Sequence, residues 1–269
     1  MTKVIVAGAA GRMGRRIAHM VDQHPGLTLA GGFEQPTCPE VGKDIGEVSG
    51  FGTTGVKIVG SPQEVLDQGQ VIIDFTFHEA TMKLARLAAE RGTGMVIGTT
   101  GLTAENLAEL KQLSAKFPCV QSPNMAVGVN VLFQVARKMA AVLGDAYDIE
   151  IIEAHHRMKK DAPSGTALKL GEMVAEGVKR DLAKVGVYSR HGMIGARTDQ
   201  EIGIQTIRAG DIVGEHTVYF AGAGERLEIT HRAHSRDNFA RGAALAAAWV
   251  ATQPNGLYNM FDVLNLQDF

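Results

Sequence analysis

Short apolar runs alternate with amphipathic stretches along the first half of the chain. Residues Lys3–Ala7 form an almost continuous apolar run, typical of a strand buried on both faces of a parallel sheet, and Arg12–Gln23 has a helical pattern. Further strands are expected at Leu27–Phe33, Val56–Val59, Val71–Phe75, Gly94–Ile97 and Pro118–Gln121, with helices at Glu79–Glu90 and Ala104–Lys116. This alternation with short loops predicts an α/β fold with a Rossmann-like doubly wound parallel sheet.

The pattern changes after residue 124. A long helix at Val129–Leu143, a strand at Asp148–Ala154 and a helix at Thr166–Gly177 come first. Strand-like stretches then follow one another without full helices between them, at Ile202–Arg208, His216–Phe220 and Arg226–His231. This α+β pattern predicts a second domain with an open mixed sheet.

The two patterns predict two domains with a cleft between them. We expect the first domain over residues 1–126 and the second over residues 127–236. A last helix is expected at Asn238–Val250, within a C-terminal stretch, 237–269, that packs back on the first domain.

Composition narrows the class of protein. Of 269 residues 45% are apolar, which is enough for a sizeable core, and the net charge of −2 favours neither a nucleic acid nor an anionic membrane as partner. The N-terminus lacks the pattern of a secretory signal, and the apolar runs are shorter than the roughly 20 residues that a bilayer requires. Cys38 and Cys119 suit neither a disulfide framework nor a C-x-x-C motif, so a cytoplasmic protein is expected.

A glycine-rich turn follows the first strand and opens the first helix, with the sequence Gly8-Ala9-Ala10-Gly11-Arg12-Met13-Gly14. Glycines allow a tight turn and close approach of a pyrophosphate, and the helix N-terminus supplies N–H groups for its oxygens. Glu34 follows the second strand, where a carboxylate can accept hydrogen bonds from an adenosine ribose. Strand, turn, helix, strand and acid arrive in the order of a dinucleotide site, although a turn used only for packing is the alternative.

The residue after this acid affects the choice of cofactor. Residue 35 is Gln, so no Arg is present there to pair with a 2′-phosphate, and Glu34 would repel one. We therefore expect NADH to be at least as good a cofactor as NADPH. Two later loops also follow predicted strands, Gly98-Thr99-Thr100-Gly101 and Ser122-Pro123-Asn124-Met125. They are either cofactor loops or ordinary turns.

The densest group of ionisable residues lies between the strand at 148–154 and the helix at 166–177. It contains His155, His156, Lys159 and Lys160 and ends in the turn Ser164-Gly165-Thr166. Nearby cations favour release of a proton from Lys159, and amides at a helix N-terminus can receive a carboxylate. A solvated loop is the main alternative to a catalytic role. A metal site is disfavoured because adjacent histidines on an extended chain point to opposite sides. A nucleophilic role for Ser164 is disfavoured because no G-x-S-x-G motif is present.

Together these motifs resemble the 4-hydroxy-tetrahydrodipicolinate reductase family, also called dihydrodipicolinate reductases, over essentially the whole chain. The segments that carry the resemblance are Gly8–Gly14, Asp74-Phe75-Thr76, Gly94–Gly101, Asn124–Asn130, Glu153–His156 with Lys159, Asp161–Ala167, and Arg208–His216. The stretch from Glu153 to Ala167 is the most specific of them.

The resemblance implies a role for individual residues. His155 would exchange a proton beside the substrate ring, Lys159 would be the general acid, and His156, Gly165 and Thr166 would hold the substrate carboxylates. The cofactor contacts that it implies are Gly8, Ala9, Ala10, Gly11, Arg12, Met13, Glu34, Gly98, Thr99, Thr100, Ser122, Pro123, Asn124 and Met125. Many family members carry Arg after the acid, and Gln35 departs from that pattern.

The resemblance also implies the reaction and the assembly. A small cyclic dicarboxylate, 4-hydroxy-tetrahydrodipicolinate, would lose water to give an imine that is reduced by hydride from NADH or NADPH, on the diaminopimelate route to lysine. The second domain would bind this substrate and join a homotetramer through its sheet. Two other functions fit the cofactor motif. One is a related two-domain dehydrogenase of an amino acid or an amino-acid semialdehyde, such as an aspartate or homoserine dehydrogenase, and the other is a non-catalytic NAD(P)-sensing protein.

Overall fold

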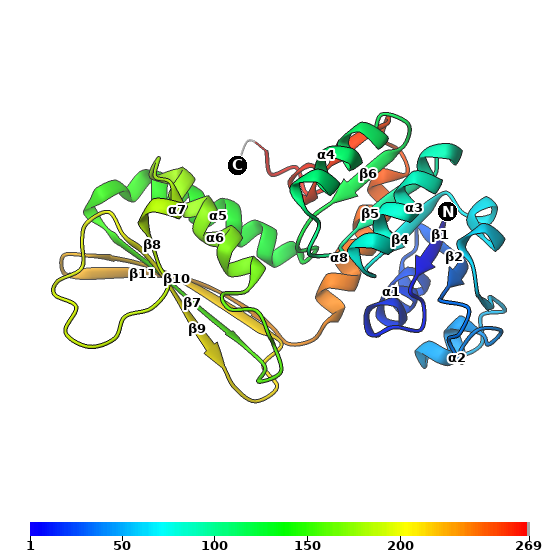
Figure 1. The fold of residues 1–269 in the computed structure, drawn as a ribbon, viewed down its shortest axis with the longest axis horizontal. Coiled ribbons are helices and arrows are strands. Elements are labelled where there is room, and N and C mark those ends of the chain that lie inside the picture. The colour runs from blue at the N-terminus through cyan, green and yellow to red at the C-terminus, as the bar shows by residue number, and fades with distance from the viewer. Residues whose placement is uncertain (268–269) are drawn as a thin grey trace. The chain divides into compact units, whose positions relative to one another are not determined.

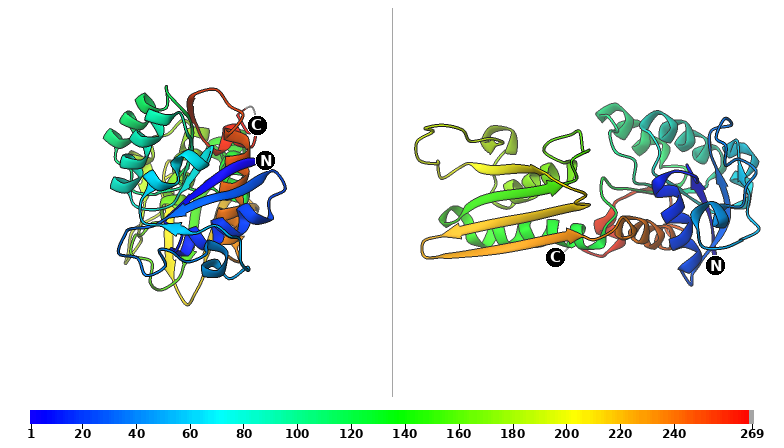
Figure 2. Two further views of the ribbon diagram at one scale, coloured as in Figure 1. Left: turned by 90° about the vertical axis from the view of Figure 1, so that its right-hand side faces the viewer. Right: turned by 90° about the horizontal axis from the view of Figure 1, so that it is seen from below.

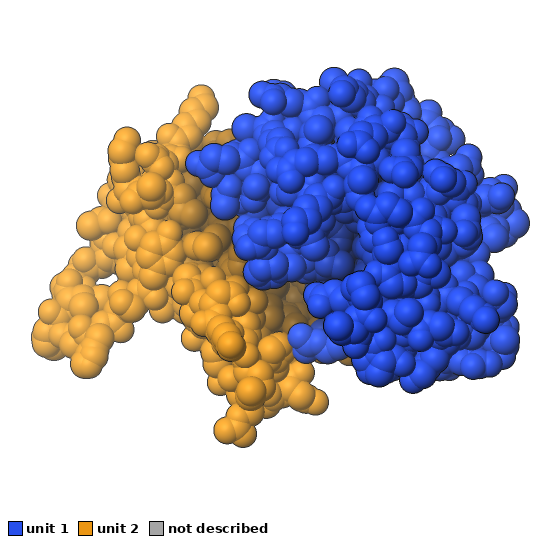
Figure 3. All heavy atoms as spheres, turned by 45° about the vertical axis from the view of Figure 1, so that its right-hand side comes forward, with its two compact units in different colours: residues 1–127, 236–265 blue, residues 128–235, 266–269 orange. Residues whose placement is uncertain are grey.

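The computed structural model describes residues 1–267, which form two compact units (Figure 3). Unit 1 comprises residues 1–127 and 236–265, and unit 2 comprises residues 128–235 together with Leu266 and Gln267. The return of the chain to unit 1 thus ends earlier than the expected stretch 237–269. Asn265, with a positive φ of 52°, ends it, and Asp268 and Phe269 lie outside the described residues.

Unit 1 is built on a seven-stranded parallel sheet in the order β12-β6-β5-β4-β1-β2-β3 (Figure 1). The strands are β1 (Thr2–Ala7), β2 (Leu27–Phe33), β3 (Ile58–Val59), β4 (Val71–Asp74), β5 (Gly94–Ile97), β6 (Pro118–Gln121) and β12 (Gly256–Tyr258). The order changes direction between β1 and β4, which pair with each other although β2 and β3 separate them in the sequence. Ligands of such sheets bind at the carboxyl ends of the strands beside this point.

Helices cover both faces of this sheet. The α-helices of unit 1 are α1 (Arg12–Gln23), α2 (Ile45–Ser49), α3 (His78–Arg91), α4 (Ala104–Leu113), α8 (Asp237–Val250) and α9 (Met260–Val263). Val4 and Val6 of β1 belong to a core with buried residues of α1 and α8, whereas Ile5 and Ala7 belong to a second core with residues of α3 and α4. Burial on both faces explains why β1 reads as a continuous apolar run.

Unit 2 contains a five-stranded mixed sheet in the order β11-β10-β7-β9-β8. Its strands are β7 (Asp148–His155), β8 (Gly186–Val187), β9 (Ile202–Arg208), β10 (Gly214–Gly222) and β11 (Glu225–Ala233). Strands β7, β9 and β8 are parallel, and β10 is antiparallel to both of its neighbours, β7 and β11. Because β9 is parallel to β7, the chain must cross over between them, and α6 makes this crossover.

The α-helices of unit 2 are α5 (Val127–Leu143), α6 (Gly165–Gly177) and α7 (Leu182–Val185), drawn in green to yellow-green in Figure 2. Helix α5 begins at the last residue of unit 1. Gly177 of α6 lies against α5, because a β-carbon there would be 2.4 Å from the carbonyl oxygen of Arg137. Among the described residues, the stretch Val127–Ala146 is long and apolar enough to cross a membrane by length and composition. Its Phe133 and Ala136 are buried in the fold, as in the core helices of soluble proteins, which pass the same test.

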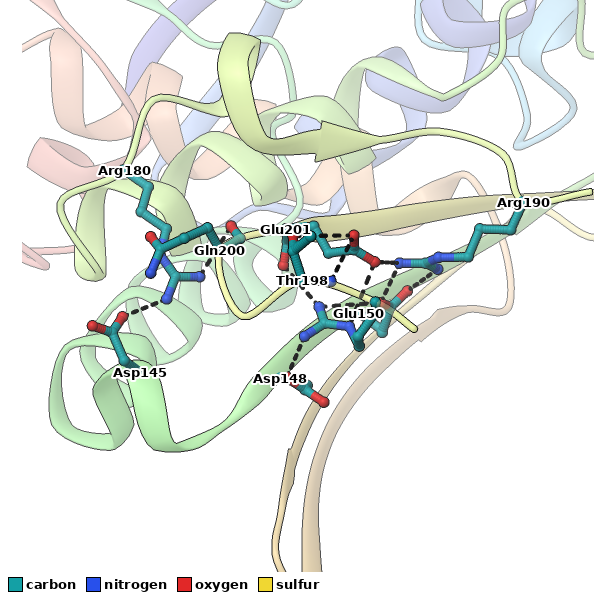
Figure 4. A network of polar contacts seen from close by, with 9 residues as sticks. Asp145, Asp148, Glu150, Arg180, Arg190, Thr198, Gln200 and Glu201 are labelled. Carbon is teal, nitrogen blue, oxygen red and sulfur yellow. Dashed lines mark hydrogen bonds and ion pairs between the residues drawn. The ribbon is translucent and has the colours of Figure 1, made fainter. Parts of the chain in front are cut away.

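A long loop between β8 and β9 is tied to the outer face of β7 by arginines (Figure 4). Arg190 donates to both carboxylate oxygens of Glu150, at 2.9 and 2.7 Å, and it also pairs with Glu201 at 2.6 Å. Arg197 pairs with Asp148 and with Glu150. These ion pairs hold the loop to the sheet by charge rather than by an apolar core.

Both parts of the predicted fold class are confirmed: a doubly wound parallel sheet and a separate mixed sheet. The largest differences from the predicted bounds lie at element ends. Helix α4 stops at Leu113, before the predicted Lys116, because the amides of Ala115 and Lys116 donate to carbonyls three residues back instead of four. Strand β12 was not predicted, because three residues are too few to show a period.

Candidate active site

The glycine-rich turn between β1 and α1 brings backbone against backbone. Gly8 has a φ of 63°, the left-handed region that favours glycine. A β-carbon on Gly14 would lie 2.0 Å from the Gly8 carbonyl oxygen, and one on Gly11 would lie 3.1 Å from it. A side chain at residue 14 would therefore displace α1. The turn brings the predicted residues Gly8–Met13 together at the N-terminus of α1, in the form of a pyrophosphate cradle.

Glu34 reaches back from the end of β2 to this turn. Its Oε1 accepts a hydrogen bond from the Ala10 amide at 3.1 Å. Glu34 and Gln35 line a cavity of about 510 Å³, together with Gly8 and Gly11. Lys83 of α3 is the one cation among the described residues that line it. The cavity joins the glycine turn to the predicted ribose-binding acid, so these residues fit the adenosine half of a dinucleotide.

The two later loops follow β5 and β6 at the same edge of the sheet. A β-carbon on Gly98 would lie 2.2 Å from the Phe75 ring, so the ring packs directly on the glycine. The Thr99 hydroxyl accepts from Thr81 at 2.9 Å, and the Ser122 hydroxyl donates to the Asn124 carbonyl at 3.0 Å. These contacts hold both loops in place.

The predicted cofactor residues of these two loops differ in exposure. Thr100 is exposed, whereas Met125 is buried and its side chain packs in the core with α1 and α8. Pro123 is exposed beside the buried Asn124, whose Oδ1 accepts from the Ala126 amide at 2.9 Å.

Asp74, at the end of β4, holds the turn that follows this strand at the same edge of the sheet. Its side chain is fully buried, and Oδ1 accepts from the Thr76 amide at 2.9 Å and from the Thr76 hydroxyl at 2.6 Å. Burial raises the pKa of Asp74. These bonds shape the turn that carries Phe75 against Gly98.

In unit 2, Glu153 connects three elements and is itself fully buried. Its Oε1 accepts from the Ser164 amide at the start of α6 at 2.9 Å, and from Arg208 Nη2 on β9 at 2.8 Å. Its Oε2 accepts from Arg208 Nη1 at 2.8 Å and lies 2.6 Å from His155 Nδ1. Burial works against the charge, but the hydrogen bonds from His155 and Arg208 hold the pKa of Glu153 well below its usual range.

His155 ends β7 and is 9% exposed. Its ring meets the ring of His216 on β10 edge-on, with centroids 5.2 Å apart. A β-carbon on Gly214 would lie 3.1 Å from His155 Nε2, so this nitrogen faces a position without a side chain. Burial, and after it the neighbouring His155, lowers the pKa of His216 to about 3, which keeps His216 neutral.

The two predicted histidines separate where β7 ends: His155 is buried, and His156 is half-buried in the following turn. Lys159 pairs with Asp161, with 2.9 Å between Nζ and Oδ1.

The turn into α6 corrects one sequence-based expectation. We expected the amides of residues 164–166 to receive a substrate carboxylate, but the Ser164 amide donates to Glu153 inside the protein. The Ser164 hydroxyl accepts from the Ala167 amide and lies 3.2 Å from His216 Nε2. Gly165 and Thr166 remain as the predicted carboxylate-binding residues.

Sequence reasoning gave no role to Glu153, Arg208, Gly214 or His216. They lie on three strands, and pairing of β7 with β9 and with β10 brings them together: Arg208 is opposite His155, and His216 is opposite Glu153. No local spacing signals this group, although every member falls in a segment that carries the family resemblance. Within residues 1–267 no group of three or more His, Cys, Asp or Glu residues is placed to hold a metal ion.

A glycine cradle at the switch point of a parallel sheet, and a second unit with a buried histidine beside cations, define a two-domain nicotinamide-dependent oxidoreductase. Residues 2–125 match the family description "Dihydrodipicolinate reductase, N-terminus", and residues 128–264 match "Dihydrodipicolinate reductase, C-terminus". The chain belongs to the dihydrodipicolinate reductase family.

Relatives agree with this assignment along the whole chain. The 4-hydroxy-tetrahydrodipicolinate reductase of Desulfotalea psychrophila is 68% identical over 100% of both chains. That of Syntrophobacter fumaroxidans is 55% identical over 99% of this chain and 100% of its own. The solved structure of dipicolinate-bound dihydrodipicolinate reductase from Paenisporosarcina sp. TG-14 has a TM-score of 0.74 and 25% identity, over 97% of this chain and 98% of that one.

Proposed function

We propose that unit 1 binds the cofactor at its glycine turn and that unit 2 binds and protonates the substrate with the segment from β7 to α6. The activity is that of a 4-hydroxy-tetrahydrodipicolinate reductase of lysine biosynthesis, in a family that uses NAD(P)H. The identity of 68% over the full length carries this conclusion. It decides against the aspartate or homoserine dehydrogenase and against the non-catalytic sensor, because those alternatives rested on the cofactor motif alone.

The residues of unit 2 have separate tasks in this proposal. The bound nicotinamide cofactor supplies hydride. Lys159 is the general acid, and His155 exchanges a proton beside the substrate ring. His156 with the Gly165 and Thr166 amides holds the carboxylates, where N–H donors and cations stabilise negative charge. The buried position of His155 and the pairing of Lys159 with Asp161 support the assignment, because both groups are held by neighbours rather than free in solvent.

The cofactor preference follows from charge at the adenosine end of the cavity. Glu34 repels a 2′-phosphate, and Gln35 offers no charge to pair with it. Lys83 lines the same cavity and offers one compensating cation. We therefore propose that NADH is at least as good a cofactor as NADPH, with NADPH still accepted.

A coupled assay tests the reaction and the preference together. The cyclic substrate is generated in situ from pyruvate and aspartate semialdehyde, and oxidation of NADH or NADPH is followed. We expect turnover only when both precursors are present. Turnover with aspartate semialdehyde alone would contradict the substrate, and an NADPH preference of about tenfold or more in kcat/KM, equivalent to about 1.4 kcal/mol, would contradict the preference.

Inhibition by a flat substrate analogue tests the dicarboxylate pocket. The Paenisporosarcina relative was solved with dipicolinate bound. We expect pyridine-2,6-dicarboxylate to compete with the substrate, and pyridine-2-carboxylate, with one acid, to inhibit more weakly. Equal inhibition by the two compounds would argue against a site for two carboxylates.

We also propose a cytoplasmic homotetramer joined through the sheets of unit 2. The outer face of this sheet supports the proposal, because Ile207 is 46% exposed on it and Ile152 of β7, on the same face, is only half-buried. Light scattering during size-exclusion chromatography measures the assembly, and a monomeric mass at micromolar concentration would contradict it.

A further inference from the structure

We propose that Glu153 is a positioning residue that fixes the tautomer and the ring orientation of His155, so that Nε2 is the nitrogen that exchanges protons with the substrate. The inference rests on the proposed function, in which His155 acts on the substrate. It adds a residue that touches neither substrate nor cofactor and acts through the histidine alone.

The hydrogen-bond partners of Glu153 determine which nitrogen of His155 carries a proton. The Ser164 amide and the two Arg208 nitrogens are obligate donors, and together they address both carboxylate oxygens. A carboxylate in a two-point pair with an arginine is ionised and can only accept. His155 Nδ1, 2.6 Å from Oε2, must therefore donate, so the neutral imidazole carries its proton on Nδ1.

This arrangement leaves Nε2 with the lone pair. Gly214 faces Nε2 and has no side chain. A β-carbon at residue 214 would lie 3.1 Å from this nitrogen, which is closer than an ordinary van der Waals contact. Two charged or titratable groups contact the His155–Glu153 pair from other elements, Arg208 from β9 and His216 from β10, and Lys159 of the following loop acts electrostatically on His216. Burial keeps His216 uncharged, so it does not compete with His155 for the carboxylate.

A purely structural role for Glu153 is the competing explanation, and the same strand supplies a matched control. Glu150 also lies on β7 and also binds an arginine at two points, through Arg190. However, Glu150 is on the opposite side of the strand from Glu153, where its carboxylate pairs with Arg190 and Arg197 of the loop in Figure 4. A substitution of Glu150 therefore shows the effect of losing an arginine-paired carboxylate from β7, whereas a substitution of Glu153 also removes the contact with His155.

The experiment compares E153Q with E150Q in the full chain. Nitrogen-15 NMR of histidine-labelled protein identifies the His155 tautomer, with the signal assigned by its absence in H155Q. The pH dependence of kcat and kcat/KM is measured in the coupled assay. In the unaltered protein we expect a proton on Nδ1. In E153Q we expect mixed tautomers, an altered pH profile and a kcat lower by about 10²-fold, with NADH affinity within about twofold.

Several results would overturn the proposal. It fails if neutral His155 carries its proton on Nε2 in the unaltered protein. This measurement does not depend on whether any variant folds. It also fails if E153Q keeps the Nδ1 tautomer and pH profile, or if E150Q changes both equally. If H155Q keeps full activity while E153Q still changes the tautomer, the catalytic role of His155 in the proposed function is wrong but the positioning contact stands.

Discussion

Lys159 and Lys160 are adjacent residues of identical chemistry in different surroundings. The Lys159 ammonium is 2.9 Å from an Asp161 oxygen and its side chain is 22% exposed, whereas Lys160 is exposed. The ion pair lowers the freedom of the Lys159 side chain and places its proton at a defined position. Of the two, Lys159 is therefore the lysine that we propose as the proton donor.

The K159A variant tests this difference. We expect kcat to fall by about 10²–10⁴-fold, the usual cost of losing a general acid, while the affinity for NADH is unchanged because the proposed cofactor site lies in unit 1. K160A is the control and should retain kcat within about twofold. Steady-state kinetics and fluorescence titration with NADH measure the two quantities. An unchanged kcat in K159A would make Lys159 a surface charge.

At the scale of elements, the turn between β1 and α1 depends on how closely helix and strand approach. Gly14 is buried on α1, and the Gly8 carbonyl occupies the space that a side chain would need. The N–H groups of the first helical turn can point at phosphates only while α1 keeps this position. In the proposed function, cofactor binding therefore depends on the whole strand–turn–helix unit rather than on any one side chain.

The G14A variant should separate α1 from the turn. A β-carbon 2.0 Å from a backbone oxygen forces a shift that costs about 1–3 kcal/mol, so the dissociation constant for NADH should rise by about tenfold or more. G94A is the control, because a β-carbon there meets only ordinary contacts at 3.4 Å and beyond. Calorimetric titration measures both. NADH affinity equal to that of the unaltered protein in G14A would show that the turn does not hold the pyrophosphate.

At the scale of the whole molecule, two buried groups make stability depend on pH in the same direction. The pKa of Glu153 is lower in the fold than its usual value of 4.5. Its contribution to the free energy of unfolding is therefore present above pH 4.5 and is lost as the pH falls below 4.5. The pKa of His216 falls from 6.5 to about 3, so below pH 6.5 the unfolded chain binds a proton that the folded chain does not. Acid therefore favours unfolding first through the histidine.

The H216Q variant isolates the histidine. Between pH 7.5 and 5.5 the unaltered protein should lose about 1.4 kcal/mol more unfolding free energy than H216Q, and this range lies above the Glu153 window. H191Q, which changes an exposed histidine, should follow the unaltered protein. Guanidinium unfolding at each pH provides the comparison. Parallel losses in H216Q and the unaltered protein would show that His216 is protonated in the fold.

Local pattern was sufficient for most of the fold. The continuous apolar run of β1, the helical period of α1 and the turn glycines depend on neighbours within a few residues, so they can be read along the chain. The order of elements then led to a parallel sheet followed by a mixed one. Strand β12 was not predicted because its partner, β6, is distant in the sequence and three residues are too few to show a period.

The sequence by itself determined the elements, the glycine cradle and the acid beside it, and the identity of the residues proposed for chemistry. Only the tertiary structure decided how those residues are held: Glu153 accepts from Ser164 and Arg208, and Gly214 faces His155. The physical reason is that side-chain periodicity is a local property, whereas pairing among β7, β9 and β10 joins segments more than 50 residues apart, such as Glu153 and Arg208.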